Sequence, residues 1–176
     1  TMLDCCRETP ISGRDTLSDI QPGERLPEMG FTLYMQDFNL AALRAWFAQP
    51  HLGLPPECIE AAQRLDFQDV QGYLNGFIDM TCMASDGQVC VIDYKSNYLG
   101  ANAAAYTPQA MNEAMGEHHY YLQALIYAIA VGRYFKLRGL ALPQIAVRYL
   151  FLRGMNGTEN GIWSWNIDAE DLVDWV

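Results

Sequence analysis

The segment from Gly76 to Asn97 constrains the fold of this chain most. It combines the pattern of a β-hairpin with an acidic residue, Asp93, placed directly after a run of apolar residues. Two arms rich in β-forming residues flank Ser85-Asp86-Gly87, and this cluster supplies the positive φ that a tight turn needs. Four consecutive apolar residues, Val89 to Ile92, lead into Asp93 and predict a strand buried on both faces. An acidic side chain at the end of such a strand needs a partner. Lys95 is two residues further on, so its side chain points to the same face.

The register of this hairpin decides whether a second aspartate, Asp79, joins Asp93. A two-residue loop would send the two aspartates to opposite faces of the hairpin. A three-residue loop from Ser85 to Gly87 places Asp79 directly across from Asp93, and Phe77 across from Lys95. We prefer this second register.

Two opposed carboxylates beside a lysine are suited to chemistry that uses Mg²⁺. The carboxylates repel one another by a few tenths to about 1 kcal/mol, and a bound divalent cation turns that repulsion into attraction. Carboxylate oxygens are hard ligands of the kind that Mg²⁺ prefers. Lys95 can stabilise charge that develops on a phosphate or position an attacking water. For an Asp-x-Lys pattern alone, a surface ion pair is the ordinary interpretation, and the buried run before Asp93 argues against it.

The same residues resemble the nuclease domains of the RecB family, the beta subunits of bacterial exodeoxyribonuclease V, within the PD-(D/E)xK superfamily. The resemblance is carried first by Gly76-Phe77-Ile78-Asp79 and by Asp93-Tyr94-Lys95-Ser96-Asn97 with its continuation Tyr98-Leu99-Gly100. It extends through residues 105–107, 109–111, 118–127 and 149–154. It covers roughly Leu65 to the C-terminus well, and the first third of the chain only loosely.

The resemblance implies an α/β fold with a PD-(D/E)xK, restriction-endonuclease-like core, in which helices flank a mixed central β-sheet. Residues 1–176 would form a single nuclease domain, a C-terminal fragment of a larger helicase-nuclease subunit. The implied function is Mg²⁺-dependent DNA phosphodiester hydrolysis of the exodeoxyribonuclease V type, coupled to a helicase in double-strand-break repair and recombination. The implied partners are DNA and the other subunits of a RecBCD-type complex. Two alternatives stay open: a non-catalytic docking module of that complex, and a stand-alone nuclease of the superfamily.

The resemblance also assigns roles to the hairpin residues. Asp79, Asp93 and the peptide carbonyl of Tyr94 would bind the metal, and Asp93 and Lys95 would be the catalytic residues. The family additionally uses a histidine ligand from a helix far upstream. His51 does not occupy a matching place, and neither do the two later histidines, so we expect that helix to lie before this chain. The isolated fragment would then bind Mg²⁺ weakly and have low activity.

Gln123 and Tyr127 are four residues apart and share one face of a predicted helix. A polar stripe beside a core face is the ordinary reading of this pattern, whereas the resemblance places both side chains against the DNA strand. His118 aligns with a family histidine whose role we leave open between packing and phosphate contact. Glu28 is a candidate neighbour of the site, although a solvated strand-end residue is the simpler reading.

The composition of the chain indicates its size class, its charge and the state of its cysteines. The chain of 176 residues is 51% hydrophobic, which is ample for the core of one domain, and no apolar stretch is long enough to cross a bilayer. Its net charge of -10 is unusual for a nucleic-acid binder, so other parts of a complex would deliver the DNA. Five cysteines without a C-x-x-C spacing favour reduced thiols in a cytoplasmic protein.

The remaining segments predict an α/β element order. We expect an irregular start over residues 1–25, a loop over 100–108, and a connection over 51–69 with a short helix at 56–64. Asn39 is a predicted N-cap, and Gly139 a predicted helix end. The predicted strands are 28–35, 145–152 and 161–167; the predicted helices are 40–47, one long helix from 109 to about 137, and a short one after Asp168.

Overall fold

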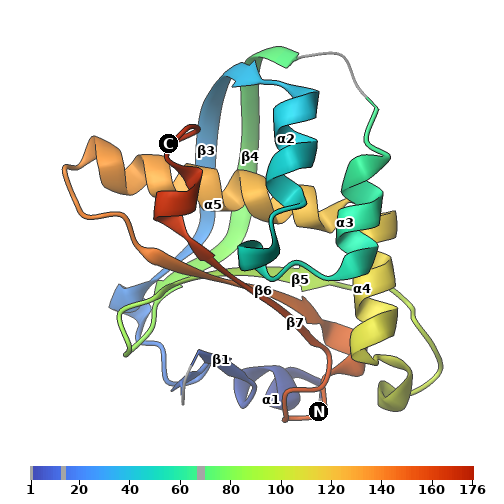
Figure 1. The fold of residues 1–176 in the computed structure, drawn as a ribbon. Coiled ribbons are helices and arrows are strands. Elements are labelled where there is room, and N and C mark those ends of the chain that lie inside the picture. Colours follow the sequence, from blue (N-terminus) through green and yellow to red (C-terminus); the bar gives the residue numbers. More distant parts are fainter. Residues whose placement is uncertain (1, 13–14, 67–69) are drawn as a thin grey trace.

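The structure is a computed structural model that describes residues 2–12, 15–66 and 70–176 (Figure 1). Parts of the predicted irregular start and the last residues of the predicted connection over 51–69 lie outside these ranges. The helices are α1 (Met2–Arg7), α2 (Leu40–Phe47), α3 (Pro56–Gln63), α4 (Pro108–Glu117) and α5 (Tyr120–Leu137). The strands are β1 (Pro10–Ser12), β2 (Asp15–Thr16), β3 (Arg25–Phe38), β4 (Val70–Met83), β5 (Val89–Lys95), β6 (Gln144–Phe151) and β7 (Ile162–Asp168).

Five strands form the central sheet in the order β3-β4-β5-β6-β7. β5 and β6 are parallel, and the other neighbouring pairs are antiparallel, so the sheet is mixed. A parallel pair needs a crossover connection, and α4 and α5 supply it here. The predicted fold class, a mixed sheet flanked by helices, is therefore confirmed.

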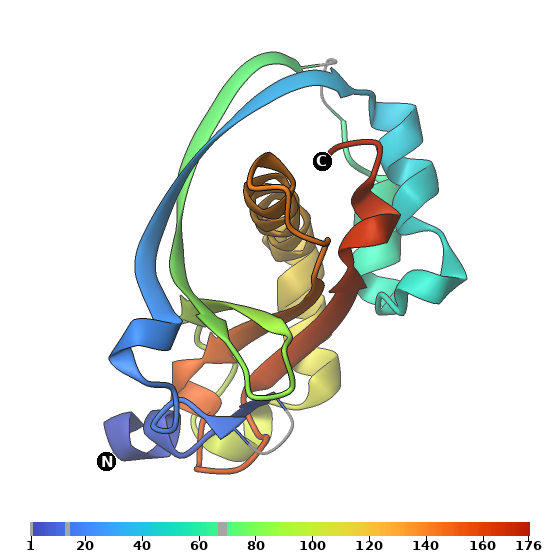
Figure 2. The same cartoon turned by 90° about the vertical axis from the view of Figure 1, so that its left-hand side faces the viewer.

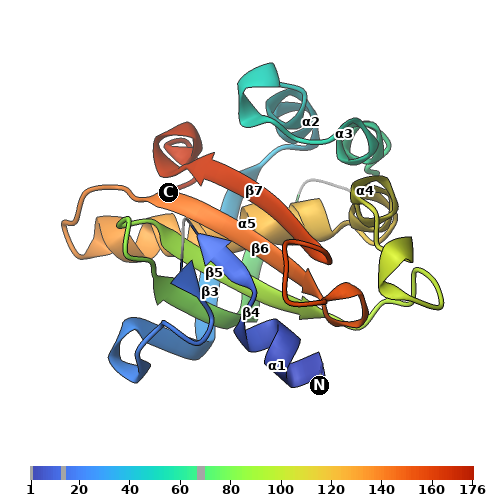
Figure 3. The same ribbon diagram turned by 90° about the horizontal axis from the view of Figure 1, so that it is seen from below.

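The two faces of the sheet bury separate apolar clusters. Val89 and Val91 of β5 pack in the larger cluster, which contains most of α5. Cys90 and Ile92, which alternate with them, pack in a smaller cluster against the N-terminal segment. Figure 2 shows α5 lying inside the curve that β3 and β4 make with the rest of the sheet. Figure 3, seen from below, shows α1 and β1 in front of the other face. Burial of β5 on both faces confirms the interpretation of its continuous apolar run.

Local sequence signals fix several elements as predicted. The side chain of Asn39 accepts a hydrogen bond from the N–H of Ala42, and α2 begins at the next residue. Gly139 has φ +67° and follows the end of α5, where its N–H donates to the carbonyl of Lys136. The carboxylate of Asp168 caps the short 3₁₀ turn that follows β7.

The prediction of one long helix from residue 109 is wrong, because His118 and His119 separate α4 from α5. His119 adopts a left-handed conformation with φ +55°, which breaks the helical path. The packing of α4 explains the position of the break. A Cβ on Gly116 would lie 2.9 Å from the carbonyl oxygen of Glu57, so α4 rests closely on α3 while α5 turns away to cover the sheet.

Two further expectations need correction. The start of the chain is less irregular than predicted, since it contains α1 and the short β1–β2 pair. β3 is longer than the predicted strand over residues 28–35, and Glu28 lies within it rather than at its end. Within the described ranges, no helix has the length and apolar character needed to span a membrane.

Candidate active site

Asp93 and Lys95 lie at the C-terminal end of β5, where the buried run ends. Both side chains are buried, with exposed fractions of 4% and 9%. The Lys95 Nζ atom lies 2.6 Å from Asp93 Oδ2, so the two charges form a direct ion pair on one face of the strand. The predicted placement of both side chains on one face is confirmed, and the burial of the pair rules out the interpretation as a surface ion pair.

The hairpin adopts the predicted register. The N–H of Ala84 donates to the carbonyl of Gln88 at 2.9 Å, which leaves a three-residue loop that ends at Gly87 with φ +83°. Strand pairing runs from Met83 opposite Val89 to Met80 opposite Ile92. Pairing of β4 with β5 then stops, so Asp79 and Asp93 do not form the predicted strand pair, although the register directs them toward each other. The predicted placement of Phe77 across from Lys95 is wrong, because Phe77 pairs with Gly30 of β3 instead.

Asp79 lies where β4 leaves β5, and its side chain takes the place of the missing backbone pair. Its Oδ2 atom accepts a hydrogen bond of 2.9 Å from the N–H of Tyr94. Met80 packs on one face of the sheet and Ile78 on the other, although alternate residues of a regular strand share a face. β4 therefore twists sharply at Asp79, and the facing strand β3 accommodates the twist at Glu28, which has φ +50°. Asp79 is exposed while Asp93 is buried, and the exposed Glu28 lies beside this twist.

Helix α5 closes a ring of hydrogen bonds around the ion pair. Lys95 Nζ donates to Gln123 Oε1 at 3.0 Å, and Gln123 Nε2 donates to the Tyr127 hydroxyl at 2.8 Å. The Tyr127 hydroxyl donates to Asp93 Oδ1 at 3.3 Å. The four-residue spacing on one helical face brings both α5 side chains to the pair, as the sequence predicted. We refer to Asp93, Lys95, Gln123 and Tyr127 as the site ring.

Two tyrosines that sequence reasoning did not assign to the site enclose the lysine. Lys95 Nζ lies 3.8 Å from the ring centroid of Tyr120 and 4.9 Å from that of Tyr149, at cation–π distance. The Tyr149 hydroxyl also donates to Gln123 Oε1 at 2.9 Å. Tyr149 is the direct neighbour of Asp93 in the parallel β5–β6 pair. Only that register reveals its role, since nothing in the local sequence around Tyr149 indicates it.

Burial sets the protonation behaviour of the site. Burial raises the pKa of Asp93 above its ordinary value, the Lys95 ammonium opposes this shift, and the nearby negative charge of Asp79 adds to it. Burial also raises the pKa of Tyr127 and of Tyr149, and the Asp93 carboxylate adds to both shifts. Both hydroxyls are therefore neutral donors at physiological pH, and the two aspartates sense each other electrostatically.

The donor set fits a divalent metal that keeps some of its water. Asp79 and Asp93 are carboxylates at the same end of β5, and Mg²⁺ is usually held by one or two carboxylates, with waters and substrate phosphate completing its shell. Mutual repulsion of the carboxylates favours a cation between them. Among the residues described, no group of three or more His, Cys, Asp or Glu side chains is placed to hold a metal.

The three histidines have other partners. His51 pairs with Asp171 at 3.4 Å, and the ring of His118 stacks on that of Tyr120 with centroids 5.2 Å apart. Nδ1 of His119 lies 3.1 Å from the Tyr121 hydroxyl. That none of them supplies the family's histidine ligand stays a prediction.

Comparison with known proteins identifies the class that this fold and site define. The PD-(D/E)XK nuclease superfamily matches residues 16–172, and the chain belongs to that superfamily. Nucleases of the superfamily depend on divalent metal ions, in agreement with the carboxylate donors described above.

The curated relatives are named RecBCD enzyme subunit RecB. The protein from Escherichia coli (strain K12) is 36% identical, over 85% of this chain and 12% of its own length. That from Haemophilus influenzae is 33% identical, over 85% of this chain and 12% of its own length. That from Mycobacterium tuberculosis (strain CDC 1551 / Oshkosh) is 36% identical, over 94% of this chain and 18% of its own length. The chain thus spans less than a fifth of the length of these relatives.

Proposed function

We propose that this chain hydrolyses DNA phosphodiester bonds with Mg²⁺, as the nuclease domain of a cytoplasmic RecB-type helicase-nuclease subunit. Its role would be in double-strand-break repair and recombination, in a complex with further subunits of the RecBCD type. Membership of the nuclease superfamily supports the chemistry. The name shared by the relatives supports the RecBCD setting.

One observation carries the proposal: the site ring lies beside Asp79 at the C-terminal end of β5. Its lysine is held 2.6 Å from a buried carboxylate by partners from two other elements, α5 and β6. A surface ion pair needs no such support, and exposed pairs contribute little to stability. Preorganised charges in a dry site favour catalysis, because they need no rearrangement when charge develops on the substrate.

Each residue then has a role that its contacts allow. Asp79, Asp93 and the Tyr94 carbonyl would hold the Mg²⁺, which when bound supplies Lewis acidity toward the phosphate and toward a water. Lys95 would offset negative charge on the phosphate and orient the attacking water.

Gln123 and Tyr127 contact Lys95 and Asp93 directly, so they position the charged pair. They would also bind the DNA strand. The net charge of -10 supports delivery of DNA by neighbouring subunits, because this surface would repel a free strand.

Calorimetric titration with Mg²⁺, and separately with Mn²⁺, tests the metal assignment. The chain should bind in the millimolar range or tighter, and the double variant Asp79→Ala, Asp93→Ala should not bind. A matched control removes two exposed carboxylates that form no ion pair in the described structure, Glu117→Ala with Glu170→Ala.

The control should bind as the unmodified chain does. Metal binding that survives in the aspartate double variant would refute the assignment. Equal weakening in the control would show that overall charge, and not the site, attracts the cation.

A further inference from the structure

A second buried charge lies on the other face of the sheet from the site ring, and the pocket beside it reaches both faces at the β7 edge. Trp163 of β7, which also lines the pocket, pairs with Tyr149 and packs in the larger cluster on the face of the ring. Arg148 of β6 pairs with Ile92, whose side chain packs in the smaller cluster, whereas the next residue, Tyr149, faces the ring. Arg148 lines a pocket of about 550 Å³, a size typical of ligand pockets. Neither aspartate of the site nor any residue of the site ring lines this pocket.

Arg148 as a whole residue is 8% exposed, and one nitrogen of its guanidinium has no hydrogen-bond partner among the described residues. Nε donates to the carbonyl of Ile11 at 2.6 Å, and Nη1 donates to the carbonyl of Val147 and to Asn166 Oδ1, both at 2.9 Å. These three acceptors are uncharged. Nη2 makes no hydrogen bond to any described residue, although it carries two N–H donors.

No carboxylate in the described ranges forms an ion pair with this buried cation. Asp86 influences Arg148 electrostatically, but its oxygens accept from the Ser12 hydroxyl and the Gln88 N–H instead. Glu159 is exposed on the pocket wall without pairing with Arg148. A charge removed from water without a counterion is costly, so the pocket favours an anion that meets Nη2.

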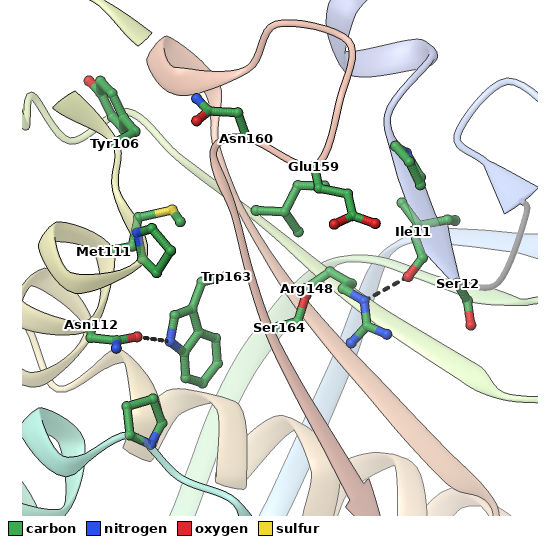
Figure 4. Close-up of a pocket in the computed structure, with 14 residues that line it drawn as sticks. Ile11, Ser12, Tyr106, Met111, Asn112, Arg148, Glu159, Asn160, Trp163 and Ser164 are labelled. Carbon is green, nitrogen blue, oxygen red and sulfur yellow. Dashed lines mark hydrogen bonds between the residues drawn. The ribbon is translucent and has the colours of Figure 1, made fainter. Parts of the chain in front are cut away.

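The remaining walls define what else the ligand carries. Figure 4 shows Trp163 and Met111 on one side of the pocket and Arg148 with Glu159 on the other. Further apolar lining comes from Pro55, Pro108 and Ile162. Arg148 is the only cation among the described residues of the lining, and together with the carboxylate of Glu159 it disfavours a doubly charged phosphate. A ligand with one negative charge and an apolar group matches the Arg148 side and the Trp163 side of the pocket.

We propose that this pocket binds the carboxylate of an apolar organic acid, with Arg148 Nη2 donating to the carboxylate and the Trp163 side receiving the apolar group. Two sources share that chemistry: a free acid, and the carboxyl end of a polypeptide with an apolar last residue. β7, one of the two edge strands of the sheet, contributes Ile162, Trp163 and Ser164 to the lining. A polypeptide end has backbone groups that can form hydrogen bonds with an edge strand, and a free acid lacks them.

Calorimetry with defined probes tests the proposal on the 176-residue chain. Phenylpropanoate represents the free acid, N-acetyl-L-phenylalanine represents the polypeptide end, and the amide of each is the uncharged control. Both acids should bind and both amides should not. Tighter binding of the acetylated amino acid would assign the site to polypeptide ends, and equal binding would assign it to free acids. Absence of binding by both acids, or equal binding of acids and amides, would overturn the proposal.

Two substitutions locate the binding. Arg148→Met should weaken it by at least about tenfold, the value of one hydrogen bond to a charged group. Because Arg148 also bonds Ile11, circular dichroism must show that this variant is folded. Glu159 is exposed, so we expect Glu159→Gln to fold normally. It should strengthen binding about twofold to fivefold at low salt, because it removes from the pocket rim a negative charge that repels the bound carboxylate.

Glu170→Gln is the matched control for Glu159→Gln. Glu170 is also exposed but follows the far end of β7, roughly 20 Å along the strand from Ile162. Its replacement should leave the affinity unchanged. Unchanged affinity in Glu159→Gln at low salt would place the bound anion away from the wall that Glu159 shares with Arg148, and would refute the assignment even where Arg148→Met fails to fold.

Discussion

Lys95 and Arg148 are the two buried cations of the described residues, and their surroundings differ completely. They lie on adjacent parallel strands, point to opposite faces of the sheet and are exposed by only 9% and 8%. Lys95 has a carboxylate at 2.6 Å, an amide oxygen and two aromatic rings around it. Arg148 has two backbone carbonyls and one amide oxygen, and no ion pair among the described residues.

The difference shows how a small sheet can hold buried charge in two ways. On the Lys95 side the positive and negative charges balance, and hydrogen bonds close the site ring on itself. On the Arg148 side the positive charge makes hydrogen bonds only to uncharged oxygens, and the carboxylate of Asp86 acts on it without forming an ion pair. Such partners offset less of the desolvation cost than a paired counterion does. A balanced pair suits a site that must keep its geometry, whereas an unbalanced charge suits capture of an anion.

The largest effect is expected from Asp93→Ala, which removes the negative half of the balanced side. The variant should lose at least about a hundredfold in cleavage of a labelled single-stranded oligonucleotide with Mg²⁺, a loss typical for one preorganised charge. Asp171→Ala, which removes a carboxylate paired with His51 near the surface, is the control and should cleave normally. Normal cleavage by Asp93→Ala would disprove the catalytic assignment.

The second largest effect is expected in the free energy of unfolding, where removal of Lys95 and removal of Arg148 should differ. Lys95→Met leaves the buried Asp93 carboxylate without its counterion and should cost about 3–5 kcal/mol in the free energy of unfolding. Arg148→Met leaves only neutral acceptors unpaired and should cost about 1–3 kcal/mol. Urea unfolding of both variants measures the order. A larger loss for Arg148→Met would mean that its dipolar partners bind it more strongly than the ion pair binds Lys95.

The contribution of the unpaired carboxylate to the cost of Lys95→Met can be measured by combining Lys95→Met with Asp93→Asn. The double variant has no uncompensated charge, so it should be more stable than Lys95→Met alone. If the two changes are simply additive, the cost of Lys95→Met comes from lost packing against Tyr120 and Tyr149 rather than from the stranded carboxylate.

A smaller effect concerns pH. Burial holds the pKa of Asp93 above its ordinary value of 3.8, so between 3.8 and the raised value the folded chain binds more protons than the unfolded chain. The free energy of unfolding of the metal-free chain should therefore fall as pH rises through that window, and this contribution should be level below it. Asp93→Asn should remove the slope. Urea titrations in the presence of a chelator measure it, and an unchanged slope would contradict the assignment to Asp93.

The smallest effect is expected from Tyr127→Phe, which opens the site ring without removing a charge. Loss of the 3.3 Å bond to Asp93 should cost about 1 kcal/mol in stability and lower cleavage severalfold. Tyr121→Phe is the matched control, because Tyr121 is a buried tyrosine of the same helix whose hydroxyl meets His119 instead. Its cleavage rate should not change, and equal losses in both variants would assign the effect to helix packing.

What the sequence could predict depended on how local the determining interactions are. The Asn39 cap and the turn before Gln88 involve residues close in sequence. The start of α2 therefore followed from pattern alone, and the pattern limited the hairpin to two registers, of which the preferred one is confirmed. The break at His119 did not, because close contact of Gly116 with α3 accompanies it and no proline marks it.

The residues of the candidate site also fall into those that local spacing predicts and those that it does not. The i, i+2 pair Asp93 and Lys95 and the i, i+4 pair Gln123 and Tyr127 were visible as spacings. The enclosure of Lys95 by Tyr149 depends on the parallel register of two strands that a helical crossover separates. No periodicity in the sequence encodes that register.

The crossover also has a kinetic consequence. The contacts that join β5 to α5 link residues 28 and 34 positions apart, from Lys95 to Gln123 and from Asp93 to Tyr127. Closing loops of this length costs conformational entropy before the long-range contacts that offset it have formed, and parallel strand pairing is intrinsically slow. We therefore expect the hairpin to form early with its lysine and aspartate still hydrated. Docking of α5 would then be the late step of folding, and the same step would create the nuclease centre.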